Sequence, residues 1–148
     1  MLLRTVEEKR RFKFYSLTEE EKQRILEEVK SVLSNLETVV LAVVHGGFLE
    51  SKIFRDIDIA IFTGYAVPPC EAEEYIEELN AKLEEKVGIP VDVKLLDYAP
   101  PSFKLTVLSK GKVLIEKRYV STLLRWAAEQ EIKSIELKRR RVKAILRK

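Results

Sequence analysis

The sequence predicts an α/β domain of the α+β type, followed by one long helix. Stretches with helical spacing of apolar residues alternate with short β-branched stretches, and the connections between them are short. Such alternation is typical of domains in which helices flank a sheet. With 148 residues the chain is long enough to bury its own core. We expect one domain over residues 1–118, with its centre at about 37–118, and a basic helical extension over residues 119–148.

Composition restricts the class of protein. Apolar residues make up 46% of the chain, as in globular proteins, and no apolar run approaches the roughly 20 residues that cross a membrane. The single cysteine, Cys70, excludes an internal disulfide and a cysteine-based zinc site. Residues 1–4 lead directly into charged sequence, so we expect a cytoplasmic protein. Abundant Lys, Arg and Glu with few Asn and Gln are typical of thermophile proteins.

Charge is distributed unevenly along the chain. The formal net charge is +3, but residues 133–148 carry eight Lys or Arg against the single acid Glu136. The tail therefore carries 8 − 1 = +7, which leaves 3 − 7 = −4 for residues 1–132. An acidic body with a basic tail is expected.

The first segment, residues 1–15, combines basic and aromatic side chains. It could bind nucleic acid, or it could pack its rings on the domain as an arm. A helix follows, because Thr18 and Glu21 have the spacing of a capping box, and it should run to about Asn35. Its apolar stripe is Ile25, Val29, Val32, Leu33 and Leu36.

Residues 38–62 form the centre of the predicted domain. Residues 38–44 are β-branched and apolar, as in a strand that is buried on both faces. A tight turn at His45-Gly46-Gly47 and a short polar loop should follow. Residues 55–62 alternate between polar and apolar, which predicts a second strand.

Two acids share one face of this second strand. Successive side chains point to opposite faces, so Asp56 and Asp58 lie together, about 7 Å apart along the strand, while Ile57 and Ile59 face the core. Asp is depleted in strands and the two carboxylates repel each other. Either both face solvent, or a divalent cation lies between them.

A third acid, Asp92, lies within another alternating stretch, over residues 90–98. Three acids on strands, together with a glycine turn after a buried strand, are more specific than any one of them. This constellation favours a cation site over two unrelated surface acids.

The remaining elements follow from turn residues and periodicity. Residues 63–70 should form a loop, and residues 71–87 a helix that ends at Gly88. A short helix over residues 102–110 should end at Gly111. A strand over residues 112–117 should follow, with Val113 and Ile115 on one face. The expected inner face of the helix over residues 71–87 is Tyr75, Ile76, Leu79 and Leu83.

From Tyr119 onward no Gly or Pro interrupts a helical pattern of some thirty residues, or about 45 Å of helix. Its first half should pack on the domain through residues such as Leu124 and Ala128. The second half, with Lys138-Arg139-Arg140-Arg141, is too polar for a core. A solvated helix end, a partner-binding or oligomer surface, and a nucleic-acid surface all remain open.

Gly46-Gly47, the loop after them, Asp56-Ile57-Asp58 and the later Asp92 resemble the nucleotidyltransferase fold of the DNA polymerase beta superfamily. The resemblance is closer to the minimal nucleotidyltransferases, or MNT proteins, and covers residues 37–118. It implies a mixed sheet flanked by helices. It also implies Mg²⁺-dependent transfer of a nucleoside monophosphate from a nucleoside triphosphate, with ATP expected, to a hydroxyl group.

The resemblance also implies roles for particular residues. Asp56 and Asp58 would hold Mg²⁺ at the triphosphate, and Asp92 would complete a second metal site and help to deprotonate the acceptor. Gly46 and Gly47 would let backbone N–H groups approach the phosphates.

Four nearby polar residues have more than one interpretation. Lys52 and Arg55 are candidates for phosphate contacts or for surface ion pairs. His45 is interpreted as a turn residue near the site rather than a catalytic base. Lys94 shares the face of Asp92 and could pair with it or reach a nucleotide.

The sequence departs from the family pattern at three points. The family most often has Gly-Ser at the turn, whereas the second position here is Gly47. Arg55 stands where a Ser commonly precedes the first acid, and the loop between Gly47 and Asp56 is about two residues shorter. These changes should affect nucleotide affinity more than the fold.

The acceptor depends on the resemblance alone. MNT proteins are often partnered with HEPN-domain toxins, which they silence by binding or by modifying a tyrosine, so an antitoxin role is implied. Small-molecule acceptors remain open. Two other classes are a catalytically weak partner-binding module of the same fold, and a nucleic-acid-binding protein that uses the basic termini.

Overall fold

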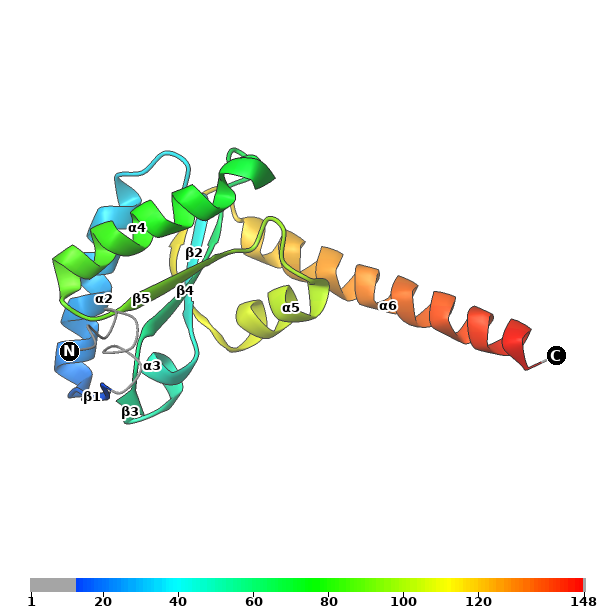
Figure 1. Ribbon diagram of the computed structural model, residues 1–148, viewed down its shortest axis with the longest axis horizontal. Helices are drawn as coiled ribbons and strands as arrows, with labels where there is room; N and C mark the ends of the chain where they lie inside the picture. Colours follow the sequence, from blue (N-terminus) through cyan, green and yellow to red (C-terminus); the bar gives the residue numbers. More distant parts are fainter. Residues whose placement is uncertain (1–12, 148) are drawn as a thin grey trace, which may run out of the picture.

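The computed structural model describes residues 13–147 and contains a four-stranded mixed sheet in the order β5-β4-β2-β6 (Figure 1). Strand β2 (Leu41–His45) is antiparallel to both of its neighbours, β4 (Ile57–Phe62) and β6 (Lys112–Glu116). Strand β5 (Val91–Leu95) runs parallel to β4. The predicted mixed sheet is therefore confirmed.

Helices cover both faces of the sheet. Helices α2 (Glu19–Ser34) and α4 (Ala72–Val87) pack on one face. Helix α5 (Pro101–Lys110) and the start of α6 (Val120–Leu146) pack on the other. Helix α6 then continues well beyond the body, as Figure 1 shows. The predicted α/β fold with a long C-terminal helix is confirmed, and the division of the chain after residue 118 stays a prediction.

The two faces of the sheet have separate apolar clusters because strand side chains alternate. In β4, Ile57, Ile59 and Ile61 point toward α2 and α4, whereas Ala60 and Phe62 point toward α5. Asp58 belongs to the second set by this alternation. The alternation therefore directs the acid toward the α5 face, away from the larger cluster. Buried residues of that larger cluster include Leu26, Val29, Leu33, Val44, Leu79, Leu83, Val91 and Val93.

Helix ends agree with the sequence signals. The Thr18 side chain accepts a hydrogen bond from the Glu21 backbone N–H at 3.2 Å, and α2 begins at the next residue after Thr18. Gly88 adopts a left-handed conformation with φ of 73° and ends α4. Of the expected inner face of α4, Leu79 and Leu83 are buried, and Tyr75 and Ile76 pack against them as partly buried residues.

Three short elements lie where the sequence predicted loops. Helix α3 (Gly47–Glu50) follows β2, and strand β3 (Ile53–Phe54) pairs antiparallel with β1 (Tyr15–Ser16). A 3-10 turn, η1 (Pro69–Glu71), precedes α4. The prediction of a polar loop after Gly47 is therefore wrong, because this segment buries Phe48 against Phe54, with ring centroids 4.9 Å apart.

Two predicted strands are too long. Strand β2 begins at Leu41, because Thr38 lies in a turn and its hydroxyl hydrogen-bonds the Tyr75 hydroxyl at 3.0 Å. Strand β5 ends at Leu95, because Asp97 turns inward and accepts hydrogen bonds from the backbone N–H and hydroxyl of Thr63. Asp97 is 4% exposed. Its hydrogen bonds hold the loop that follows β4.

The expectation that Val113 and Ile115 share a face of β6 is wrong. Ala42 pairs with Ile115 and Val43 with Val113, so a bulge leaves Leu114 without a partner in the ladder. As a result Val113 is 42% exposed while Ile115 is 8% exposed.

The two ends of the chain differ in what the structure describes. Residues 1–12 of the expected N-terminal arm lie outside the described residues. Tyr15 of the same arm lies in β1, and its ring stacks on that of Phe54. At the other end, Val120 and Leu124 of α6 pack on the α5 cluster and Ala128 is buried, which confirms the predicted packing of its first half. Within residues 13–147, every helix is too short or too polar to cross a bilayer.

Candidate functional site

The three predicted acids come together on the α5 face of the sheet. Asp58 in β4 lies directly opposite Asp92 in β5 in the parallel register. Asp56 immediately precedes β4, rather than lying within it. One carboxylate oxygen from each residue lies within 4.8 Å of the others, and all three side chains are partly buried. The acidic cluster that the sequence suggested is therefore present as a geometric unit.

Burial and mutual repulsion raise the pKa values of two of these carboxyls. The pKa of Asp58 is raised to about 6, first by burial and then by the charge of Asp56, with a smaller contribution from Asp92. The pKa of Asp56 is also raised, mainly by burial and then by Asp92. The charges of Arg55 and then Lys94 oppose the pKa shift of Asp56, and the charge of Lys94 opposes that of Asp58. At neutral pH the negative charge of the cluster is therefore only partly compensated by the basic side chains around it.

Lys94 is the cation that the structure places at the cluster. Its Nζ lies 3.7 Å from Oδ2 of Asp92 and 5.7 Å from the ring centroid of Phe103 in α5. The side chain is 49% exposed, so it can move without disturbing the core. Of the two interpretations of Lys94, the structure has the ion pair with Asp92.

His45 lies at the end of the strand near the site, as expected, but it is the last residue of β2 rather than part of the turn. It pairs across the ladder with Asp58, and its ring lies edge-on to Phe103 with centroids 5.7 Å apart. Burial, followed by the charge of Lys94, lowers the pKa of His45, so the ring is neutral at pH 7. Its Nε2 is buried and has no hydrogen-bond partner within residues 13–147.

Gly46 connects β2 to α3 and touches the acidic cluster. Its φ is 77°, which L-residues rarely adopt. A Cβ at this position would also overlap Oδ2 of Asp58. Glycine is therefore required here for two independent reasons, one in the backbone and one in the site.

Gly47 is not required in the same way. It is exposed as the first residue of α3, and a Cβ there would lie 3.8 Å from the Cβ of Phe54, an ordinary contact. The backbone N–H groups of Gly47 and Phe48 have no acceptor within the helix, whereas those of Leu49 and Glu50 donate to the Gly46 carbonyl. A side chain could therefore be added without disturbing the local structure.

We expect Gly47→Ser to tighten nucleotide binding several-fold. The added hydroxyl can donate to a phosphate oxygen beside these N–H groups, and one such hydrogen bond contributes about 1 kcal/mol. Calorimetric titration of ATP in the presence of Mg²⁺ measures the change, with Gly47→Ala as the control that adds only the Cβ. Unchanged or weaker binding by Gly47→Ser would show that the phosphates lie elsewhere.

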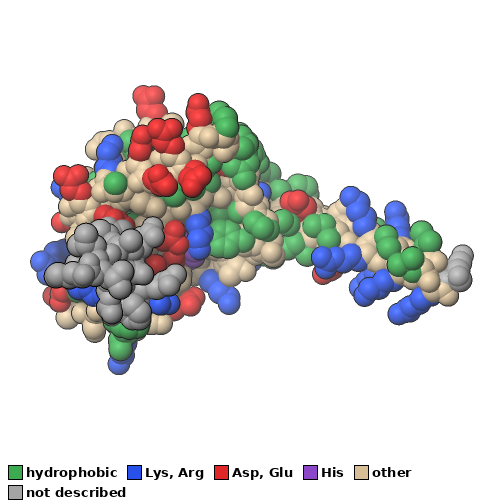
Figure 2. Space-filling model, viewed as in Figure 1, with side chains coloured by type: hydrophobic (Ala, Val, Ile, Leu, Met, Phe, Trp, Pro, Cys, Tyr) green, Lys and Arg blue, Asp and Glu red, His purple; other side chains and the backbone are tan. Residues whose placement is uncertain are grey.

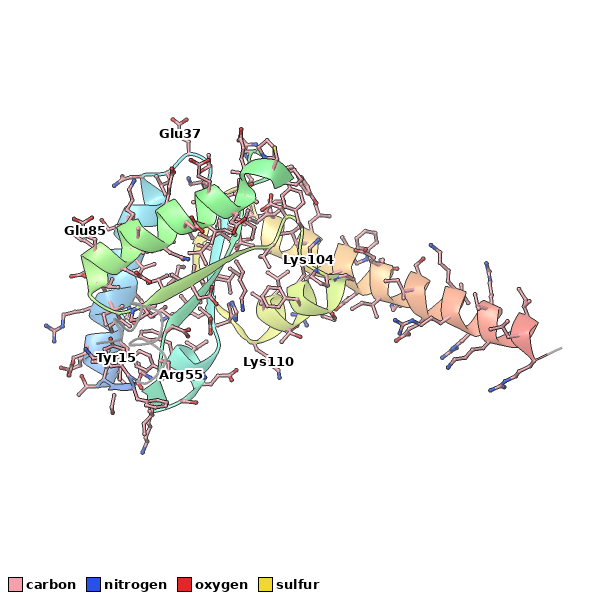
Figure 3. The ribbon with its side chains drawn as sticks, viewed as in Figure 1. Tyr15, Glu37, Arg55, Glu85, Lys104 and Lys110 are labelled. Carbon is pink, nitrogen blue, oxygen red and sulfur yellow. The ribbon has the colours of Figure 1, made fainter. Side chains whose placement is uncertain are left out.

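The two other phosphate candidates lie at the same end of the sheet. Arg55 directly precedes Asp56, and its guanidinium carbon lies 5.9 Å from the ring centroid of Phe14 (Figure 3). Lys52 is exposed between α3 and β3. Neither forms an ion pair with the three acids in the part of the chain that the structure describes. Their role as phosphate ligands stays a prediction.

Lys22 supports the site but was not singled out from the sequence. This α2 residue is 8% exposed, and its Nζ donates a hydrogen bond to the Ser51 carbonyl at 2.9 Å. The Nζ also lies 5.5 Å from the ring centroid of Phe48 and 5.6 Å from that of Phe54. Lys22 thereby ties the segment after Gly47 to α2. Lys22 precedes the buried Leu26 by four residues, so the sequence spacing already placed it on the buried face of α2.

The stability of the metal-free protein should fall as pH rises from about 4 to above 6. The pKa of Asp58 is about 6 in the folded chain and near its ordinary value of 3.8 in the unfolded chain. Between these values the folded state binds more protons, so raising the pH favours unfolding. Urea unfolding in EDTA measures this dependence, and Asp58→Asn should weaken it. An equal slope in both proteins would contradict the assignment.

The donor set suits a divalent cation. Asp56, Asp58 and Asp92 offer three carboxylate oxygens within bonding reach of a common point, and such oxygen ligands favour hard cations. The raised pKa values of Asp56 and Asp58 reflect repulsion and burial that a bound cation would relieve. These three residues could therefore hold a metal ion.

Comparisons with known proteins place this geometry in context. The family model described as polymerase beta, nucleotidyltransferase matches residues 27–119. No curated protein matches the sequence significantly. A solved complex of a tri-AMPylated Shewanella oneidensis HEPN toxin with an MNT antitoxin contains a chain that is 19% identical. The match covers 86% of this chain and 99% of that chain, with a TM-score of 0.63.

Two further complexes are similar at the level of the fold. A chain of an MntA–HepT toxin–antitoxin complex is 18% identical over 88% of this chain and 100% of its own length, with a TM-score of 0.59. A chain of a toxin–antitoxin complex with AMP-PNP is 19% identical over 89% of this chain and 100% of its own, also with a TM-score of 0.59.

Proposed function

This chain belongs to the polymerase beta nucleotidyltransferase family, and we propose that it transfers a nucleoside monophosphate from a nucleoside triphosphate to a hydroxyl group of a partner protein. The observation that carries the proposal is the cluster of Asp56, Asp58 and Asp92 beside Gly46. The match to the family agrees with the resemblance that these residues gave in the sequence.

We propose that the metal is Mg²⁺ and that Asp56, Asp58 and Asp92 hold it. The three oxygens lie close enough together to share a cation, and their repulsion is only partly offset by Lys94. When bound, the ion supplies positive charge that neutralises the triphosphate and the charge that develops on it during transfer.

The protein's own groups would bind and orient the triphosphate. The backbone N–H groups at Gly47 and Phe48 have no helical acceptor, and the close approach of Gly46 to Asp58 places this turn beside the acids. Lys94, released from Asp92 by a competing cation, would be free to contact a phosphate. Both features keep the α-phosphorus near the carboxylates.

The transfer itself needs few protein groups. The acceptor oxygen forms a bond to the α-phosphorus as the bond to pyrophosphate breaks, and pyrophosphate leaves with the electron pair of that bond. The hydroxyl proton must go to a nearby base, for which Asp92, whose side chain is 43% exposed, is the candidate. Asp92 would then release the proton to solvent.

For the acceptor we propose a tyrosine of a HEPN-type protein, with ATP as the nucleotide and an antitoxin role for this chain. Support comes from the similar complexes, one of which holds a tri-AMPylated HEPN toxin and another AMP-PNP. Coverage of 99% to 100% of those chains supports the comparison over the whole fold. A hydroxyl on a protein also suits an acid cluster that is partly exposed at the edge of the body.

Two rivals account for less of the structure. A partner-binding module without turnover would gain nothing from three clustered acids, in which burial and mutual repulsion raise the pKa values of Asp56 and Asp58. A nucleic-acid-binding protein would use the basic tail, but it would leave the acidic cluster and the glycine turn unexplained.

AMP transfer to a purified HEPN-domain protein tests the proposal. The chain is mixed with that protein, ATP and Mg²⁺, and intact-mass spectrometry is used to detect an increase equal to AMP. Asp58→Asn should abolish the increase, whereas Glu85→Gln, which alters an exposed carboxylate of α4, should not. Transfer by Asp58→Asn at the wild-type rate would overturn the assignment of the site.

A further inference from the structure

The long helix α6 carries an apolar stripe that runs along its full length. At about 100° per residue, the stripe residues fall within roughly 40° of one another around the helix axis. They are Leu124, Ala128, Ile135, Val142 and Leu146. Leu137 lies on the opposite side. A stripe this narrow and this long is typical of a helix that packs against one other surface.

The domain covers only the beginning of the stripe. Leu124 packs on the cluster beneath α5, and Ala128 is 2% exposed. Exposure then rises to 36% at Ile135, 54% at Val142 and 78% at Leu146. Figure 1 shows the reason, because the second half of α6 extends beyond the body. Apolar surface that continues an internal interface into solvent is a mark of a binding site.

Basic side chains flank the exposed part of the stripe. Lys138 and Arg139 lie on its two sides. They are two of the eight Lys or Arg residues in the sequence from 133 to 148. Figure 2 shows basic side chains around the projecting helix, while acidic side chains gather over the body near α4. The local net charge of 8 − 1 = +7 favours an occupant of opposite charge.

Charge and apolar surface together select among three occupants. A second copy of α6 would match the stripe but would bring two tails of +7 together. A nucleic acid would match the charge but would leave the side chains of Val142 and Leu146 exposed to water. A protein helix or groove with an apolar centre and an acidic rim matches both features.

We propose that the second half of α6 is the docking segment for a partner protein that presents an apolar strip bordered by Asp and Glu. Ile135, Val142 and Leu146 insert into that strip, and Lys138 and Arg139 pair with its acidic rim. The docked protein is the acceptor of the transfer only if the proposed function holds. Docking itself needs neither nucleotide nor metal.

A pair of matched substitutions separates the stripe from the charge. Val142→Glu and Leu137→Glu each add one negative charge to α6 at side chains of similar exposure, 54% and 50%. Only Val142 lies on the stripe. Burial of a valine side chain contributes about 1.5 kcal/mol, or about tenfold in affinity. The two full-length variants should therefore differ by about that factor.

The probe is a labelled helical peptide with Leu at its core positions and Glu at the flanking positions, and its binding is measured by fluorescence anisotropy. We expect the wild type to bind it, Val142→Glu to bind about tenfold more weakly than Leu137→Glu, and a matched peptide with flanking Lys not to bind. Each measurement is made in EDTA without nucleotide, so a failure of AMP transfer leaves the result unchanged.

Four results would overturn the proposal. The two variants could bind equally, which would make charge alone responsible. The Lys-flanked peptide could bind as well as the Glu-flanked one. The wild type could form dimers in sedimentation experiments that Val142→Glu abolishes and Leu137→Glu does not, which would make the occupant a second copy. The wild type could bind an RNA oligonucleotide more strongly than the peptide, with the same affinity after Val142→Glu, which would assign the tail to nucleic acid.

Discussion

Asp58→Asn is expected to abolish metal-dependent nucleotide binding and transfer while the protein stays folded. Asp58 lies between the other two acids, opposite Asp92 in the sheet and two residues after Asp56. Losing its charge removes one of three cation ligands. Metal stabilisation of several kcal/mol corresponds to a loss of about a thousandfold or more in transfer rate.

The fold should tolerate this change because the carboxylate is a source of repulsion in the metal-free protein. Burial and Asp56 raise the pKa of Asp58 to about 6, so an uncharged amide of similar size relieves both effects at neutral pH. Thermal unfolding in EDTA should give an equal or higher midpoint for Asp58→Asn. A large loss of stability, or nucleotide binding as tight as in the wild type, would contradict the account.

Gly46→Ala is expected to eliminate nucleotide binding through one added methyl group. The methyl group meets Oδ2 of Asp58, and the backbone at φ of 77° is unfavourable for alanine. The backbone strain alone costs about 1–3 kcal/mol, because ψ of −157° places Gly46 in a region that is almost exclusive to glycine. Displacement of the Asp58 carboxylate additionally separates it from Asp56 and Asp92, so binding should fall much more than stability.

Gly88→Ala is the matched control for this effect. Gly88 has a φ of 73°, and a Cβ there meets no atom within 4 Å. Both variants should lose stability in urea unfolding, Gly46→Ala more because its backbone conformation is almost exclusive to glycine, but only Gly46→Ala should lose binding of ATP in calorimetry. Equal loss of binding in both would mean that general destabilisation, and not the position of Asp58, controls the site.

The regular elements could be predicted because their signals are local. Thr18 and Gly88 mark helix ends by their own chemistry, and the lack of Gly or Pro after Tyr119 predicted α6. The alternation of Asp58 with Ile57 and Ile59 correctly placed the acid away from the larger core. These features depend on neighbours within a few residues.

The missed features depend on contacts between distant segments. Helix α3 is held by burial of Phe48 and by the hydrogen bond from Lys22 to Ser51, which lie 29 residues apart. The bulge opposite Ala42 arises from the pairing of β2 with β6. Proximity of Asp92 to Asp58 likewise requires the parallel register of β4 and β5. In the sequence, alternation marked Asp92 as a third acid on a strand, and the family resemblance then implied that the three acids share a site.

The most direct test of the central claim is thermal unfolding with ATP, GTP, CTP or UTP, each in Mg²⁺ and in EDTA. The wild type is compared with the double variant Asp56→Asn/Asp58→Asn. A metal-dependent nucleotide site predicts a higher midpoint for the wild type in Mg²⁺ with at least one nucleotide, and no shift in EDTA or in the double variant. No shift in the wild type at millimolar nucleotide, or an equal shift in both proteins, would contradict it.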